Sequence, residues 1–154
     1  MKKIAIACDH GGVELKKQII SLLQDKYEFI DCGCNTLESV DYPDYAFAAA
    51  KKVVNKEADF GILICKSGIG MSIAANKVKG IRCALIDNLE NAKLCHMHNN
   101  ANMMAFGANN VDAISAKQFI EAYDSVEFET RHQKRIDKIE RYEQSCELWW
   151  KNFR

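Results

Sequence analysis

The chain has 154 residues, with 21 Lys and Arg against 21 Asp and Glu, and 48% of its residues are hydrophobic. This composition is typical of a globular protein with a sizeable core. The balanced charge argues against a protein that binds nucleic acid or a membrane surface through bulk charge. Apolar runs are too short to span a bilayer, and Asp9 and His10 interrupt the first run too early for a signal peptide. We therefore expect a single cytoplasmic domain over residues 1–154.

The seven cysteines are expected to be free thiols, because a cytoplasmic protein is kept reduced. Their spacing does not predict a zinc site, since Cys32 and Cys34 are too close and the 95–98 segment lacks a second paired element. The chain also lacks the Cys-x-x-Cys motif of a thiol redox protein. We expect no metal and no cofactor.

Taken in chain order, short apolar runs alternate with segments of helical periodicity. Strands are predicted at 4–8, 29–32, 60–65, 81–86 and 103–106, and helices at 13–23, 45–54, 68–76, 89–96 and 111–123. Continuous apolar strands separated by helices indicate a parallel sheet that is covered on both faces. The predicted fold is a Rossmann-like α/β/α sandwich with a five-stranded parallel sheet. Such folds bind ligands beyond the carboxyl ends of the strands.

The C-terminal residues 131–154 have the pattern of an extended amphipathic helix. Ile136, Ile139 and Tyr142 follow one another at helical spacing, and charged residues lie between them. Two adjacent tryptophans near the end are costly to leave in water. We expect this helix to pack on a partner subunit.

Two strand ends carry residues suited to chemistry. Asp9 and His10 follow the first strand, where they face the crevice or form an Asx-type turn that caps the next helix. Residues 65–72, Cys-Lys-Ser-Gly-Ile-Gly-Met-Ser, join a strand to a helix N-terminus, where successive N–H groups favour an anion. A thiol there, next to Lys66, is expected to have a substantial thiolate fraction. The alternative is that Cys65 is a small buried apolar residue.

Two further segments carry polar groups that suit catalysis or phosphate binding. His98 lies in a polar loop before the last strand and is a candidate acid–base group, or else a surface residue. Arg131 and Arg135 share a helical face at i, i+4, which suits a phosphate clamp. The alternative is a solvated basic face.

Together these segments resemble the ribose-5-phosphate isomerase type B family, in the same order from residue 3 to about residue 143. The matching motifs lie at 4–12, 41–43, 61–65, 67–77, 98–102 and 131–135. The resemblance implies cofactor-free interconversion of ribose 5-phosphate and ribulose 5-phosphate, through an enediolate, in the non-oxidative pentose phosphate pathway. It also implies a homodimer or tetramer with its active site at the subunit interface.

The resemblance assigns a role to each matching residue. Cys65 corresponds to the base that moves a proton between C2 and C1, and His98 corresponds to the group that opens the sugar ring, with the Ser67 hydroxyl. The expected enediolate stabilisers are the N–H groups of Gly68, Ile69, Gly70, Met71 and Ser72. Asp9 and Asn99 are expected to hold sugar hydroxyls, and the phosphate set is His10, Arg131 and Arg135. The neighbouring subunit is expected to contribute His98 and Asn99.

Two positions depart from the family pattern. Lys66 stands where the family often has glycine, so it reaches the substrate or obstructs its approach. Asn109 stands where many members have an arginine near the phosphate, a loss that Lys134 could offset. Three alternative functions have different requirements. A hexose 6-phosphate isomerase needs more room for its substrate beside the strand-end loops. A phospho-acceptor domain needs an aspartate at the position of Cys65. A phosphosugar-binding module does not need the Cys65 thiol.

Overall fold

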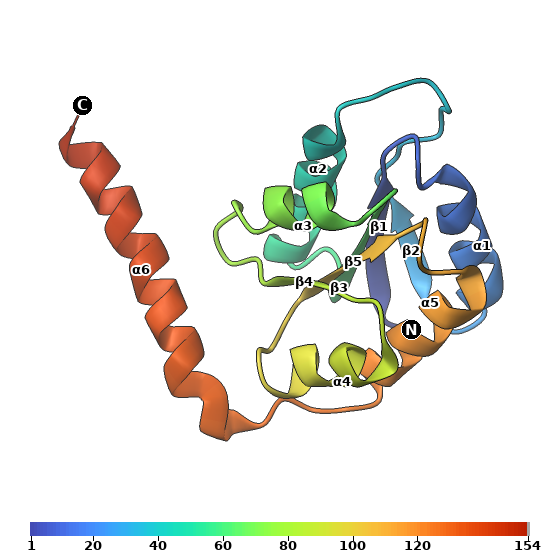
Figure 1. Cartoon of the computed structure of the whole chain (residues 1–154). Helices are drawn as coiled ribbons and strands as arrows, with labels where there is room; N and C mark the ends of the chain where they lie inside the picture. The colour runs from blue at the N-terminus through green and yellow to red at the C-terminus, as the bar shows by residue number, and fades with distance from the viewer. Residues whose placement is uncertain (154) are drawn as a thin grey trace.

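The computed structural model describes residues 1–153, and its strands form one parallel sheet in the order β2-β1-β3-β5-β4 (Figure 1). The elements in chain order are β1 (Lys3–Cys8), α1 (Val13–Leu23), β2 (Glu28–Asp31), α2 (Tyr42–Val54), β3 (Phe60–Cys65), α3 (Ile69–Ala75), β4 (Cys83–Leu85), α4 (Leu89–Met97), β5 (Met103–Gly107), α5 (Ala113–Asp124), the 3-10 helix η1 (Thr130–His132) and α6 (Gln133–Asn152). This arrangement confirms the predicted α/β fold and its five-stranded parallel sheet.

The two faces of the sheet carry side chains of different size. Side chains alternate along a strand, so β1 directs Ile4 and Ile6 into a cluster with α1, α4 and α5. It directs Ala5 and Ala7 into a second cluster with α2 and α3, which also contains Cys65 of β3. Because both faces are covered, β1 and β3 have the continuous apolar sequences of buried parallel strands.

Before the last helix, three elements begin two or more residues away from the position that the sequence predicts. β4 is shorter than predicted because the Asn102 side chain accepts the Arg82 N–H at 2.8 Å, in place of a strand partner. α2 begins at Tyr42 with Pro43 in its first turn, where a missing N–H costs little. α5 begins later than predicted because Asp112 caps it, accepting the Ser115 N–H at 2.7 Å.

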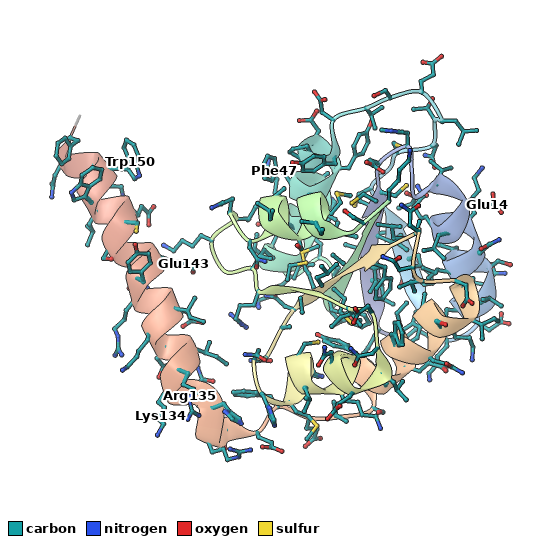
Figure 2. The ribbon with its side chains drawn as sticks, in the orientation of Figure 1. Glu14, Phe47, Lys134, Arg135, Glu143 and Trp150 are labelled. Atoms are coloured by element: carbon teal, nitrogen blue, oxygen red, sulfur yellow. The ribbon has the colours of Figure 1, made fainter. Side chains whose placement is uncertain are left out.

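The expectation of one helix from residue 131 is wrong at its start. The N–H of His132 donates to the Glu129 carbonyl at 3.0 Å, which closes a 3-10 turn before α6 begins. Ile136 of α6 is buried, whereas Trp149 and Trp150 are 55% and 65% exposed near the far end of the helix (Figure 2). Their packing on a partner subunit therefore stays a prediction. Arg154 lies outside the described residues.

Two further expectations concern the membrane and the thiols. None of the helices within residues 1–153 combines the length and the apolarity needed to cross a bilayer. All seven cysteines are free in the structure.

Candidate active site

The structure divides the predicted site residues between opposite edges of the sheet. Cys65 ends β3, whereas the loop that begins with His98 leads into the first residue of β5. Asn102 of that loop accepts the N–H of Gly61 at 3.0 Å, and Gly61 precedes Cys65 by four residues, or about 13 Å of strand. In Figure 1 the end of α4 and the start of α6 lie below the sheet, and α3 lies above it.

We therefore distinguish two groups of predicted site residues. The carboxyl-edge group comprises Asp9, His10, Asn109 and residues 65–72. The amino-edge group comprises His98, Asn99, Arg131 and Arg135. Within one chain, the structure brings the members of each group together but does not bring the two groups together.

Cys65 carries the thiol of the carboxyl-edge group. Its residue is 6% exposed, and its Sγ accepts the N–H of Gly68 at 3.1 Å. Gly68 has φ +76°, and a Cβ there would lie 2.9 Å from the carbonyl carbon of Phe106, so the position requires glycine. An N–H group directed at the sulfur stabilises negative charge on it.

The predicted row of N–H donors is only partly free. Gly68 donates to Cys65, Ile69 donates to Ser67 Oγ at 3.2 Å, and Ser72 donates to the Gly68 carbonyl at 3.1 Å. Within residues 1–153, the N–H groups of Gly70 and Met71 have no protein acceptor. Of the five predicted donors, these two can bind a substrate oxygen without first breaking a bond.

Asp9 and His10 are held by backbone groups. Asp9 is 8% exposed, and its Oδ1 accepts the Gly11 N–H at 2.9 Å, which is the Asx-type turn weighed in the sequence. His10 Nδ1 accepts the Val40 N–H at 3.3 Å. The proton of a neutral His10 is therefore on Nε2, where it can be donated to an anion. No sequence pattern predicted the Val40 contact.

Lys66 lies across the neighbouring loop. A Cβ on Gly11 would come within 2.6 Å of Lys66 Cγ, so the lysine stem packs directly on that glycine. The Lys66 carbonyl accepts the N–H of Asn109 at 3.0 Å. This hydrogen bond connects the two residues that depart from the family pattern. Lys66 is also the only lysine or arginine in the loops that follow the five strands.

The His98 loop at the other edge is fixed by an arginine from outside the predicted site. Arg82 donates through Nε to the Asn99 carbonyl at 3.2 Å and through Nη2 to the Asn100 carbonyl at 2.8 Å. The polar loop thus has a defined position at the end of α4. A groove of about 640 Å³ lies beside it, bordered by the start of α6 and lined partly by Ile81, Ala84, Ile136 and Ile139.

Arg131 and Arg135 do not form the simple helical pair that the sequence suggested. Arg131 lies in η1 and donates through Nη2 to Glu129 Oε2 at 2.7 Å. Arg135 lies in α6 (Figure 2), and its Nη1 is 3.0 Å from His132 Nδ1. The His132 ring in turn packs against the His98 ring at a tilt of 39°, with ring centroids 4.6 Å apart. Sequence reasoning gave no role to Glu129 or His132, because their contacts depend on the 3-10 turn.

The electrostatics of this cluster favour an anion. Desolvation, with Arg131, His98 and Arg135 nearby, lowers the pKa of His132 below its ordinary value. His98, Glu129 and His132 place possible metal-ligand atoms within 4.8 Å of one another. However, Arg131 already binds Glu129 Oε2 and Arg135 binds His132 Nδ1. Two guanidinium groups in contact with these candidate ligand atoms oppose the binding of a cation and favour the binding of a phosphate.

The match to a known protein family spans both groups of residues. The family model for ribose/galactose isomerases matches residues 4–139. The chain is 50% identical to the putative sugar phosphate isomerase YwlF of Bacillus subtilis, covering 92% of this chain and 97% of that one. It is 43% identical to ribose-5-phosphate isomerase B of Escherichia coli, covering 94% and 98%.

Solved structures agree with this result. The structure resembles ribose-5-phosphate isomerase B of Clostridium thermocellum, with a TM-score of 0.90 and 42% identity over 94% of this chain and 99% of that one. It resembles the Mycoplasma genitalium enzyme with bound ribulose-5-phosphate, with a TM-score of 0.87 and 42% identity over 92% and 96%. The chain belongs to the ribose/galactose isomerase family.

Proposed function

We propose that this protein interconverts ribose 5-phosphate and ribulose 5-phosphate, with Cys65 as the catalytic base. The observation that carries the proposal is the hydrogen bond from the Gly68 N–H to Cys65 Sγ at 3.1 Å, at the carboxyl end of a central strand. Two relatives with at least 42% identity are named as ribose-5-phosphate isomerases, one of them with ribulose-5-phosphate bound. The reaction belongs to the non-oxidative pentose phosphate pathway.

Each complete site is formed by two copies of the chain. One copy supplies the carboxyl-edge group with its thiol, and the second supplies the amino-edge group with His98 and the two arginines. The support for this arrangement is the separation of the two groups by the length of a strand, because no side chain of one group reaches the other within one chain. The protein is thus a homodimer or a higher oligomer of such pairs, in the cytoplasm.

The reaction starts with a cyclic sugar phosphate. His10, Arg131 and Arg135 hold the phosphate through charge-assisted hydrogen bonds, and Asp9 and Asn99 hold sugar hydroxyls. His98 transfers a proton between the ring oxygen and the anomeric hydroxyl, with Ser67 beside it, and the ring opens to the aldehyde. The reacting carbon C2 then lies next to Cys65.

Proton transfer between carbons follows. The Cys65 thiolate takes the proton from C2, and the electron pair moves onto the carbonyl oxygen at C1 to give an enediolate. The free N–H groups of Gly70 and Met71 bind the oxygen that carries the new charge, a contribution that is typically about 10²–10³ in rate for one such donor. The proton of the C2 hydroxyl moves to the C1 oxygen, Cys65 returns its proton to C1, and the C2 oxygen becomes the ketone of ribulose 5-phosphate.

The test is complementation between two inactive variants. Cys65→Ala and His98→Asn proteins are assayed alone with ribose 5-phosphate and EDTA, and again after co-refolding at equal amounts. In a mixed dimer one site carries both substitutions and the other carries neither, so the mixture is expected to regain about a quarter of wild-type activity. Refolded mixtures that stay as inactive as either parent would contradict a shared site. Wild-type protein without activity on ribose 5-phosphate, but active on a hexose 6-phosphate, would contradict the pentose substrate.

A further inference from the structure

One carboxylate lies at the centre of the amino-edge group. Glu129 Oε2 accepts hydrogen bonds from Arg131 Nη2 at 2.7 Å and Arg131 Nε at 2.9 Å. The same oxygen is 3.7 Å from His132 Nε2 and 3.9 Å from His98 Nε2. The Glu129 N–H also donates to the Met97 carbonyl at 2.9 Å. The residue is thus fixed by its backbone against the end of α4, directly before His98.

The contact uses the part of Arg131 that would bind a phosphate. Nε and Nη2 form one edge of the guanidinium group, and that edge is the one that pairs with an oxyanion in a side-on fork. Here both donors converge on a single carboxylate oxygen. While Glu129 keeps them, this edge of Arg131 has no donor left for a ligand.

We infer that Glu129 is an internal counter-ion, which the substrate phosphate displaces from Arg131. The inference rests on the proposed function, in which Arg131 and Arg135 bind the phosphate. A phosphate dianion offers three oxygens and about twice the charge of a carboxylate, so it is the stronger partner for two arginines. Displacement costs little, because the Arg131 and Glu129 side chains are 65% and 35% exposed and solvent-exposed ion pairs are weak.

The counter-ion has a physical reason to exist in the free protein. Arg131, Arg135 and two histidines lie together, and His132 Nε2 is buried within residues 1–153 without a hydrogen-bond partner. Glu129 offsets this positive charge when no substrate is bound. The contact with Glu129 therefore lowers the affinity for substrate but holds Arg131 in a defined position.

The test compares Glu129→Gln with Glu127→Gln in the full-length protein. Glu127 lies two residues earlier in the same segment, is exposed, and has no ion pair within the described residues. Binding of inorganic phosphate is measured by calorimetry, and KM for ribose 5-phosphate is measured by a coupled assay. In Glu129→Gln, both the phosphate Kd and KM are expected to fall by about two- to fivefold at low salt. The difference from wild type should shrink as salt rises, because salt also weakens the internal pair. Glu127→Gln should match wild type.

Further variants keep the result interpretable. If Glu129 acts through Arg131, Glu129→Gln will have no effect on phosphate affinity in an Arg131→Ala background. Glu129→Asp, which keeps the charge on a shorter side chain, should give a phosphate Kd between those of wild type and Glu129→Gln. An unchanged or weaker phosphate affinity in a folded Glu129→Gln protein overturns the inference, since it would mean that Glu129 supports binding. Tighter phosphate binding in a protein without turnover of ribose 5-phosphate would leave the counter-ion intact and contradict only the proposed function.

Discussion

The sulfur of Cys65 lies 3.1 Å from the backbone nitrogen of Gly68, which donates its proton to it. The bond closes the turn between β3 and α3, and α3 begins with the segment that carries the N–H groups of Gly70 and Met71. The candidate base and the two candidate oxyanion donors therefore belong to one short segment, residues 65–71. This proximity suits a proton transfer in which charge moves from the base to a substrate oxygen.

Replacement of this base should abolish most of the activity. We expect Cys65→Ala to lower kcat for ribose 5-phosphate by about 10²–10⁴, the usual contribution of a general base. KM should change little, because the phosphate is held elsewhere. Steady-state kinetics test this, with Cys32→Ser as the control, since Cys32 is a partly buried thiol outside the site. A Cys65→Ala enzyme with wild-type kcat would remove the thiol from the mechanism.

Lys66 should matter for anions at the site. It is the only lysine or arginine in the loops after the strands, so Lys66→Ala is expected to raise KM for ribose 5-phosphate by about two- to fivefold. Alkylation of Cys65, followed by peptide mass spectrometry, gives a second measurement. In Lys66→Ala, the rate of Cys65 alkylation should fall more for iodoacetate than for neutral iodoacetamide. The reason is that only the negatively charged reagent is attracted by the lysine. Lys51→Ala, an exposed position on α2, is the control, and equal loss with both reagents would argue for a steric effect instead.

Lys16 should be a stability determinant. Its side chain is fully buried, and Nζ donates to Asp31 Oδ1 at 2.7 Å, to the Cys34 carbonyl at 2.8 Å and to Asn35 Oδ1 at 3.0 Å. Lys16→Met removes these three hydrogen bonds and should lower the free energy of unfolding by about 2–4 kcal/mol. Urea unfolding measures the change, and exposed Lys17→Met should be nearly neutral.

His132 should make stability sensitive to mild acid. Its pKa in the folded protein lies below the ordinary value of 6.5, because desolvation and nearby positive groups disfavour the charged ring. The unfolded chain therefore binds a proton more readily, so this contribution is present above pH 6.5 and is lost as pH falls through the folded pKa. NMR titration should place the His132 midpoint below 6.5. Unfolding of His132→Gln should show a smaller loss of stability between neutral and mildly acidic pH than wild type.

The sequence by itself determined the layers of this protein and the place of its thiol. Strand and helix periodicity is a local property, so the five strands, the parallel sheet and Cys65 at a strand end could all be predicted. The motif residues of the amino-edge group could also be named, because each lies in one of two short polar segments, 98–102 and 131–135. Their resemblance to one family, rather than their spacing alone, assigned their roles.

Tertiary structure alone decided which of these residues meet. The length of β3 separates Cys65 from the His98 loop, and no local sequence pattern predicts that separation. Lys16 would be placed on the surface by its charge, yet it is buried because β2 and its following loop bring oxygen atoms to it. Glu129 reaches Arg131 only because a 3-10 turn precedes α6. Each of these contacts depends on side chains that long-range packing brings together, and that is why the sequence could not show them.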